Sequence, residues 1–408
     1  MKLFEDLEWR GLIKDMSNEK EIKRLLNEEK ITFYWGTDPS GDSLHIGHLS
    51  SVFLAKRLKD AGHHPILLVG GATGLIGDPR PSTERAMITV EALNKNYDSL
   101  YKQITDLFGF DMVNNYDWSK EINFLEFLRD YGKYFNVNYM LDKDIVRRRL
   151  ETGITYCEFS YMIMQALDFA YLYENRNCIM QVAGSDQWGN ITAGIDLIKK
   201  KLDKEAYCFT MPLILDKEGK KFGKSEGNAL WIDKEKTSSY EIYQYLINVD
   251  DSLVIHYLKV LTFLTKEEIE KIDEEIKQNP EARIGQKALA KELITFLHGE
   301  EEYNNAIKIS EILFSGEIDK LTKKEIDIAF KGLPFLQLND EKNIVDALVD
   351  SEVCSSKREA REFIQNGSIT INGKKITDLD FIINKAIAID KETIVIRRGK
   401  KKYYLLKF

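Results

Sequence analysis

The sequence lacks the features that mark several common classes of protein. Its four cysteines lie far apart and include no Cys-x-x-Cys pair, which argues against a disulfide framework and a cysteine-ligated zinc site. It has no apolar run of about 18 residues that would cross a bilayer. Its first residues, MKLFEDLEWRGL, have neither the basic start nor the apolar core of a signal peptide. We therefore expect a cytoplasmic protein without membrane contact.

An overall excess of positive charge is also lacking. The chain carries 58 Lys and Arg against 66 Asp and Glu, a net charge of −8, which argues against a protein that coats nucleic acid indiscriminately. The charge is uneven, because residues 341–408 carry 14 Lys and Arg against 10 Asp and Glu. This C-terminal part is therefore the candidate for contact with a polyanion.

What the sequence does contain is enough chain for two or three domains: 408 residues, of which 43% are hydrophobic. Short apolar runs that end in glycine or charge alternate with helix-length segments, which is typical of a parallel sheet covered by helices. The runs are Ile31–Gly36, His64–Gly71, Cys178–Gly184 and Phe209–Leu215. We predict an α/β domain with a Rossmann-like, doubly wound parallel sheet over residues 1–225.

The pattern changes twice after this domain. Helical segments without strand signals, such as SYEIYQYLINV, predict an all-α domain over residues 226–320, followed by a linker over residues 321–340. Residues 341–408 contain a helix pattern and then a strand pattern, and we predict a small α+β domain there.

Two local signals support the last domain. In SSKREAREFIQNG, Ser356 is expected as the helix N-cap, with Glu359 completing a capping box and Gly367 stopping the helix. In SITINGKKIT, the dipeptide Asn372-Gly373 predicts a tight turn between two paired strands.

Two histidines, His45 and His48, stand where the first predicted strand turns into a helix. Ligands of open α/β sheets bind at the carboxyl ends of strands, and phosphates favour helix N-termini. Imidazole N–H groups add donors there, and Gly47 leaves space for an adenine or ribose. Taken alone, the motif is more often two ordinary histidines of a surface or a core, and a pair of metal ligands is the weakest alternative.

A glycine- and lysine-rich segment, DKEGKKFGKSEG, follows the last predicted strand of this domain. Its three lysines, Lys220, Lys221 and Lys224, are able to clamp a triphosphate, although a solvated basic loop is the alternative. The segment does not fit the P-loop pattern. The pair of motifs, HIGH after the first strand and KFGKS after the last, resembles the two signatures of class I aminoacyl-tRNA synthetases.

Further blocks narrow the resemblance to the bacterial-type tyrosyl-tRNA synthetases. YWGTDPSGDSLHIGHL, LLVGGATGLIGDP, EFSYMIMQALDF, GSDQWGNITAG, KFGKS and QKALAKELITFLHG occur in the order typical of that family. Residues 341–408 resemble a small RNA-binding domain of a ribosomal small-subunit protein, which also ends the bacterial tyrosyl enzymes, whereas the tryptophan enzymes lack it. Residues 226–320 would then lie on the anticodon side.

The resemblance implies a reaction and its partners. Such enzymes activate L-tyrosine with ATP, giving tyrosyl-adenylate and pyrophosphate, and then transfer the tyrosyl group to the 3′ end of tRNA(Tyr). ATP is a substrate, Mg²⁺ offsets its charge, and no protein metal site is predicted. The bacterial-type members are homodimers, so we expect a homodimer here.

Three polar residues, Tyr161, Gln165 and Asp168, share one face of an apolar helix by their spacing. A buried carboxylate needs partners, so Asp168 either meets a ligand donor or lies on the helix surface. The resemblance implies that Asp168 and Tyr34 bind the phenolic hydroxyl of tyrosine. The other tyrosine contacts that it implies are Asp78, Tyr161, Gln165, Gln187 and Thr73.

The resemblance also implies the ATP side of the site. His45 and Ser40 would meet phosphates, His48 the adenine or ribose, and Lys221 and Lys224 the leaving pyrophosphate. Without the resemblance, GSDQWGN and GGATGLIGDP could each be simple turns. The implied contacts of ATP and adenylate are Gly36, Asp38, Gly47, Gly184, Asp186 and Lys224.

Basic residues beside aromatic ones make the last domain a candidate for binding the tRNA body, with a solvated charged domain as the alternative. The candidate contacts are Lys357, Arg358, Arg361, Lys374, Arg397, Arg398 and Lys400.

One stretch departs from the family pattern. The sequence reads GDPRPSTERA where the family has a glycine and lysines before Ser-Glu-Arg, so the charge contacts of this loop, carried here by Arg80 and Arg85, are in doubt.

Two other functions remain open: an RNA-binding scaffold that has lost catalysis, and a small-molecule nucleotidyltransferase with HxGH. The intact signatures argue against the first, and the helical and RNA-type regions argue against the second.

Overall fold

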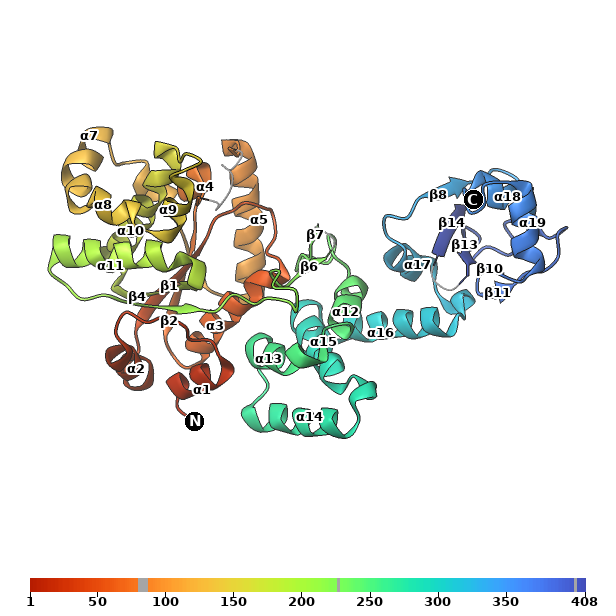
Figure 1. Ribbon diagram of the computed structural model, residues 1–408, viewed down its shortest axis with the longest axis horizontal. Helices are drawn as coiled ribbons and strands as arrows, with labels where there is room; N and C mark the ends of the chain where they lie inside the picture. The colour runs from red at the N-terminus through yellow and green to blue at the C-terminus, as the bar shows by residue number, and fades with distance from the viewer. Residues whose placement is uncertain (80–86, 226–227, 400–401) are drawn as a thin grey trace. The chain divides into compact units, whose positions relative to one another are not determined.

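A computed structural model describes residues 1–79, 87–225, 228–399 and 402–408. The chain divides into two compact units (Figure 1). The first consists of Met1–Lys236 and Val249–Leu289, and the second of Thr237–Asn248 and Ala290–Phe408. No helix among the described residues is long and apolar enough to cross a membrane.

The first unit is built on a five-stranded parallel sheet. Its strands are β1 (Thr32–Thr37), β2 (His64–Val69), β3 (Asp111–Asn114), β4 (Cys178–Gly184) and β5 (Tyr207–Met211). The order is β3-β2-β1-β4-β5, and every neighbouring pair is parallel. The chain therefore winds in both directions from β1, and the predicted doubly wound α/β fold is confirmed. Strand β3 is an addition to the four predicted strands.

Helices cover this sheet and extend beyond it. The longer helices of Met1–Lys236 are α1 (Leu3–Arg10), α2 (Glu19–Glu28), α3 (Leu49–Asp60), α5 (Val90–Phe108), α10 (Tyr156–Arg176) and α11 (Trp188–Leu202). The short ones are α4 (Thr73–Ile76), α6 (Tyr116–Ser119), α7 (Phe124–Glu126), α8 (Val137–Leu141), α9 (Asp144–Arg149) and the turns η1 (Ile46–His48), η2 (Phe127–Tyr131), η3 (Gly132–Tyr134) and η4 (Ser185–Gln187).

Helix caps and close packing hold α10 on the sheet. Thr155 caps the helix by accepting from the Glu158 backbone N–H, and Asn177 ends it in the left-handed region at φ 50°. A Cβ at Gly194 of α11 would lie 2.9 Å from the ring of Phe169, so glycine lets α11 approach α10 closely. These helices bury one face against strand side chains that include Tyr34 and Leu68. The face of α10 that carries Asp168 is thereby held against β1.

The remaining elements of the first unit lie in later sequence. They are the strand pair β6 (Lys224–Ser225) and β7 (Asn228–Ala229), the helices α13 (Asp251–Leu261) and α14 (Lys266–Gln278), and the turn η5 (Pro280–Ala282). Helix α15 (Ile284–His298) contributes to both units.

The second unit combines helices with a second five-stranded sheet. The helices are α12 (Ser239–Ile247), α16 (Glu300–Ser315), α17 (Lys323–Ala329), α18 (Ile344–Asp350), α19 (Lys357–Gln365) and the turn η6 (Ile318–Lys320). The strands are β8 (Phe335–Gln337), β10 (Ile369–Ile371), β11 (Lys374–Lys375), β13 (Thr393–Arg398) and β14 (Lys402–Lys407), in the order β11-β10-β13-β14-β8, with a separate pair β9 (Lys342–Asn343) and β12 (Ile382–Ile383).

Helices outside the predicted last domain share its core. Val395 and Leu405 of the sheet pack with Ile309, Ile326 and Phe330 of α16, α17 and the residue after it. Strand β8, inside the stretch predicted as a linker, pairs in parallel with β14. The C-terminal sheet therefore continues into the helices that precede it.

The local signals in this unit are confirmed in all but one respect. Asn372 and Gly373, at φ 49° and 85°, form the turn of the hairpin in which Ile371 pairs with Lys374. Ser356 caps α19. The predicted capping box is wrong, because the Glu359 carboxylate accepts from the backbone and hydroxyl of Ser355, at 2.7 and 2.6 Å, instead of from Ser356.

Candidate active site

A cavity of about 360 Å³ opens at the carboxyl ends of β1 and β4, where the strand order changes direction. Ligands of open α/β sheets bind at this place. All predicted residues for catalysis, tyrosine and ATP line it except Lys224, whose side chain lies outside the described part of the structure. They are Tyr34, Gly36, Asp38, Ser40, His45, Gly47, His48, Thr73, Asp78, Tyr161, Gln165, Asp168, Gly184, Asp186, Gln187 and Lys221.

Asp168 lies at the buried end of the cavity, only 2% exposed. Asn115 Nδ2 and Trp118 Nε1 donate to its two carboxylate oxygens at 2.9 and 2.8 Å. Burial raises the pKa of Asp168 to about 7, against the effect of these two hydrogen bonds. A carboxylate has about four acceptor positions, so Asp168 retains room for a ligand donor besides its two protein partners.

Two other polar atoms at this end are buried without a hydrogen-bond partner among the described residues. They are the hydroxyl of Tyr34 and Oε1 of Gln181, which lie opposite each other in the register of β1 and β4. Burial, with the charge of Asp168, raises the pKa of Tyr34, so its hydroxyl keeps its proton. An unpartnered buried polar group costs roughly 1–3 kcal/mol, and a polar ligand group would offset this cost.

Asn115, Trp118 and Gln181 were not predicted from the sequence. Gln181 left a usable signal, because it is the one polar side chain in the strand run CIMQVAG. Asn115 follows β3, which has a single buried residue, Val113, and gives no strand pattern.

Two further carboxylates line the cavity and are fixed by neighbours. Asp38 accepts from the hydroxyls of Thr73 and Tyr161 at 2.7 and 2.9 Å. A Cβ at Gly70 would lie 2.2 Å from Oδ1 of Asp38, so glycine is required there. These contacts give the carboxylate of Asp38 one orientation.

Asp78 is held by residues of η4 and α11. It accepts from Nε2 of Gln187 at 2.8 Å and from Nδ2 of Asn190 at 3.2 Å, and Asn190 was not predicted. Asp38, Asp78 and half-buried Gln165 all line the cavity, and their oxygens are acceptors that suit an ammonium group.

The HIGH signature forms the short turn η1 before α3. The backbone N–H of His45 donates to Nδ1 of His48 at 3.2 Å, which places the proton of His48 on Nε2. Burial lowers the pKa of His48 to about 3, so the ring is neutral. The two imidazoles stack with centroids 3.8 Å apart. His48 is therefore a neutral donor through Nε2.

The chain around KFGKS joins this turn through its backbone. The N–H of Ile46 donates to Leu230 O at 2.8 Å, and that of Ile232 donates to Leu44 O at 3.0 Å. A Cβ at Gly47 would lie 2.8 Å from Cε1 of His45 and 3.0 Å from the carbonyl oxygen of Phe222, so glycine is required where the HIGH turn meets this chain. The two signatures are thus parts of one continuous wall.

Comparisons with known proteins cover both regions of the chain. The family model of class I tRNA synthetases for tryptophan and tyrosine matches residues 26–315, and that of the C-terminal domain of tyrosine–tRNA ligases matches residues 325–406. The tyrosine–tRNA ligase of Listeria monocytogenes (serotype 4a, strain HCC23) is 49% identical over 418 residues, which cover 100% of both chains. The chain belongs to the tyrosine–tRNA ligases.

Other relatives agree with this family. Tyrosine–tRNA ligase 2 of Bacillus cereus (strain ATCC 10987 / NRS 248) is 49% identical over 417 residues and all of both chains. The crystal structure of a C-terminally truncated mitochondrial tyrosyl-tRNA synthetase of Aspergillus nidulans has a TM-score of 0.69 and 32% identity, over 77% of this chain and 94% of that one. The predicted family and activity are confirmed: as a tyrosine–tRNA ligase, this enzyme activates tyrosine with ATP and joins it to tRNA.

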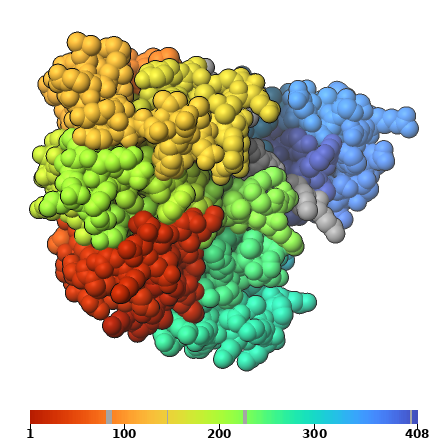
Figure 2. Space-filling model, turned by 60° about the vertical axis from the view of Figure 1, so that its left-hand side comes forward, coloured from red at the N-terminus to blue at the C-terminus, as the bar shows by residue number. Residues whose placement is uncertain are grey.

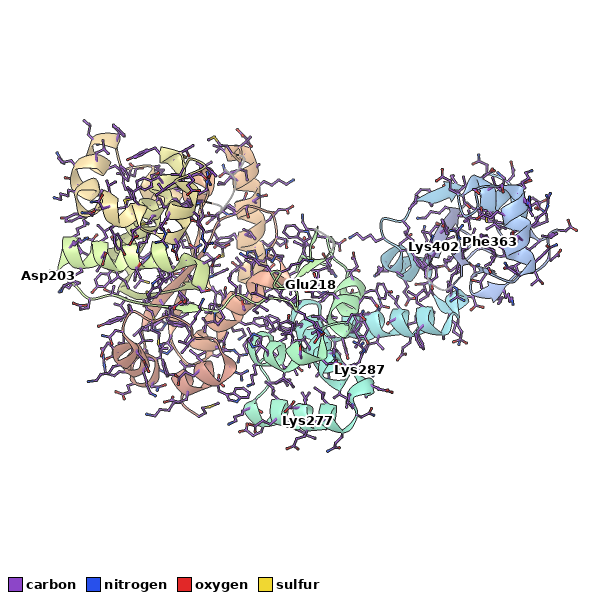
Figure 3. All side chains as sticks on the ribbon, viewed as in Figure 1. Asp203, Glu218, Lys277, Lys287, Phe363 and Lys402 are labelled. Atoms are coloured by element: carbon purple, nitrogen blue, oxygen red, sulfur yellow. The ribbon has the colours of Figure 1, made fainter. Side chains whose placement is uncertain are left out.

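The predicted tRNA contacts of this tyrosine–tRNA ligase lie in the second unit. Arg358 and Arg361 are exposed on α19, the helix marked by Phe363 in Figure 3. Lys357 on the same helix pairs with Asp346 at 2.6 Å. The structure thus brings two exposed guanidinium groups to one helix, three positions apart.

The other basic candidates have acidic or backbone neighbours, or are half-buried. Lys374 pairs with Asp319 at 3.1 Å. Arg398 donates to the carbonyl of Val353, and Arg397 is half-buried. Lys400 lies outside the described residues, as do Arg80 and Arg85 of the GDPRPSTERA stretch.

Proposed function

We propose that the buried end of the cavity binds the side chain of L-tyrosine. The observation that carries this proposal is that two polar groups are buried at this end of the cavity. They are the carboxylate of Asp168 and the hydroxyl of Tyr34, which has no hydrogen-bond partner among the described residues. A phenol donates one hydrogen bond and accepts others, so it would donate to Asp168 and accept from Tyr34. Asp78, Tyr161 and Gln165 would then hold the ammonium group.

ATP–pyrophosphate exchange with each of the twenty amino acids tests the proposal. Exchange is expected with tyrosine and is expected to be absent with the other nineteen at matched concentration. Equal exchange with an aliphatic amino acid would contradict the assignment of the buried end.

The wider part of the cavity would hold ATP. The carboxylate of tyrosine attacks the α-phosphorus, a new O–P bond forms, and the bond to the β-phosphate breaks, so pyrophosphate leaves. Donors in place before the reaction stabilise the charge on the phosphate oxygens. The proposed phosphate contacts are Ser40, His45, Lys221 and Lys224, and His48 would meet the adenine or ribose. Thr73 and Gln187 would contact the amino acid, and Gly36, Asp38, Gly47, Gly184 and Asp186 the adenylate.

The second step transfers the tyrosyl group. A hydroxyl of the 3′-terminal ribose of tRNA(Tyr) attacks the carbonyl carbon of the adenylate, an ester forms, and AMP leaves. The exposed cations of α19, with Lys357, Lys374, Arg397, Arg398 and Lys400 as further candidates, would hold the tRNA body.

Mg²⁺ would enter with ATP as part of the substrate. Among the described residues, no group of three or more His, Cys, Asp and Glu side chains is placed to hold a metal ion. Asp38 and Asp78 each already accept two hydrogen bonds from the protein. The triphosphate would therefore supply ligands for Mg²⁺. The Mg²⁺ concentration that ATP–pyrophosphate exchange needs is then expected to rise with the ATP concentration.

Replacing Asp168 by Asn or Tyr34 by Phe is expected to lower the preference for tyrosine over phenylalanine by about 10- to 100-fold, because each change removes a partner of the phenolic hydroxyl. The ratio of kcat/KM for the two amino acids in pyrophosphate exchange measures this. Tyr173→Phe, on α10 but outside the cavity lining, is the control. Unchanged ratios in both variants would exclude the assignment.

Tyrosine binding is expected to depend on pH through Asp168. Burial raises its pKa to about 7, and the ionised form accepts the phenolic hydrogen, so affinity should rise about 10-fold from pH 6 to pH 8. The free energy of unfolding should change in the opposite sense and fall from about pH 4 to pH 7, because the folded chain retains a proton that the unfolded chain releases. Equilibrium dialysis measures the affinity for tyrosine, and Asp168→Asn should remove the pH dependence of that affinity.

We also propose a cytoplasmic homodimer. Exposed apolar side chains gather in one segment of the first unit, the orange-to-yellow surface in Figure 2. Each is at least 44% exposed: Phe124, Leu125, Leu128, Val137, Leu150 and Tyr156. A second copy would remove this apolar area from water. Sedimentation equilibrium tests the dimer, and a monomer mass at micromolar concentration would contradict it. Cell fractionation tests the cytoplasmic location.

A further inference from the structure

A buried tyrosine lies beneath the KFGKS segment. Tyr257 of α13 is 1% exposed, and its hydroxyl donates to the carbonyl of Leu215 at 2.8 Å. Its ring packs on the ring of Phe222, with centroids 4.5 Å apart. Leu215 pairs with Lys221 across the base of the KFGKS loop. Tyr257 therefore contacts the loop at both ends of its base.

Phe222 connects Tyr257 to the wall of the cavity. It is the second residue of KFGKS, lines the cavity and is 1% exposed. Its N–H donates to Ile214 O at 2.9 Å, and its carbonyl oxygen lies against Gly47 of the HIGH turn. A shift of the Phe222 ring would move the neighbouring Lys221, whose Nζ lies 3.6 Å from Oδ2 of Asp186.

Helix α13 is itself anchored to helices of the N-terminal region. Arg10 of α1 donates to the carbonyls of Lys259 and Leu264 at 2.9 and 2.8 Å. Arg57 of α3, the helix that starts after HIGH, donates to the carbonyl of Thr262. Both arginines are less than a tenth exposed. The hydroxyl of Tyr257 is thus fixed relative to α3 and the HIGH turn.

We propose that Tyr257 is a positioning residue for the adenylation step, which holds the base of the KFGKS loop so that Lys221 meets the pyrophosphate. The inference rests on the role proposed above for Lys221. Tyr257 does not line the cavity and touches no substrate position. Its effect would therefore appear in the rate of chemistry and in pyrophosphate binding, not in tyrosine binding.

Tyr257→Phe keeps the ring against Phe222 and removes the hydrogen bond to Leu215. We expect it to lower the single-turnover rate of adenylate formation by about 10-fold, since small displacements of an aligned group cost large factors in rate. The Kd of tyrosine should stay within about 2-fold of the wild type. In the reverse reaction, the Kd of pyrophosphate for the preformed adenylate complex should rise.

A double-mutant cycle separates this inference from the role of Lys221. If Tyr257 acts through Lys221, Tyr257→Phe should have little further effect in a Lys221→Ala background. A slow Lys221→Ala with a normal Tyr257→Phe would overturn the inference and leave the role of Lys221 intact. A normal Lys221→Ala would overturn the role of Lys221 itself.

The matched control is Tyr243→Phe, which alters a buried tyrosine of α12 in the second unit. It should leave the adenylation rate unchanged. An equal loss of rate in both variants, or a loss of tyrosine affinity in Tyr257→Phe, would mean that Tyr257 has only a general structural role.

Discussion

Replacing Lys221 by Ala is expected to slow the formation of tyrosyl-adenylate by about 10- to 1,000-fold, with a much smaller change in the Kd of tyrosine. The ammonium group lines the cavity on a half-exposed side chain, where negative charge gathers as pyrophosphate leaves. A contact that strengthens in the transition state lowers the rate more than it lowers ground-state binding. His45→Ala should show the same pattern, and stopped-flow measurement of a single turnover gives both quantities.

The neighbouring lysine supplies the control for charge. Lys220 lies one residue away, pairs with Glu218 and does not line the cavity. Lys220→Ala removes the same charge from the same loop and should change the adenylation rate by less than about 2-fold. Equal losses in the two variants would point to the charge of the loop as a whole, and a main effect on tyrosine Kd would contradict the proposed contact.

Reversing the two exposed arginines of α19, Arg358→Glu with Arg361→Glu, is expected to reduce kcat/KM for tRNA by at least about 100-fold while adenylate formation continues at the normal rate. Each guanidinium is proposed to neutralise a phosphate, and an opposite charge would repel it. The slope of log affinity against log salt should become shallower by about 1.5 to 2. Aminoacylation and filter binding across a salt series measure both effects.

Lys385→Glu with Lys391→Glu makes the same change in net charge elsewhere in this part of the chain. Its effect on charging should be clearly smaller if α19 makes the contact. Equal effects of the two pairs would show that net charge alone attracts the tRNA. Normal charging by the α19 variant would remove that helix from the binding surface.

The sequence predicted the sheet well because its main strands are apolar runs with clear ends. It grouped the candidate site residues because HIGH and KFGKS stand in the segments that come after β1 and β5. It did not reveal β3, whose four residues include one buried side chain. The donors that hold Asp168 depend on β3, since Asn115 comes directly after it, so they were missed with it.

Contacts between segments that lie far apart in the chain were not predicted either. Strand β8 is three residues long and pairs with β14 at the far end of the chain, so no local pattern distinguishes it from a linker. Glu359 was correctly placed near the start of α19, but which backbone N–H its carboxylate reaches depends on a side-chain conformation that spacing does not determine.

The backbone pairing between residues 44–46 and residues 230–232 determines when the active site can form during synthesis. The HIGH segment is made early, but its hydrogen-bond partners at Leu230 and Ile232 follow after the whole sheet has been made. Tyr257 and the anchored end of α13 come later still. A ribosome-bound chain that ends before Ile232 contains every strand of the sheet but lacks part of this pairing, so it should make no adenylate. Contacts between such distant segments also form slowly. Arrested nascent chains of graded length would test this, and activity before residue 232 has emerged would exclude it.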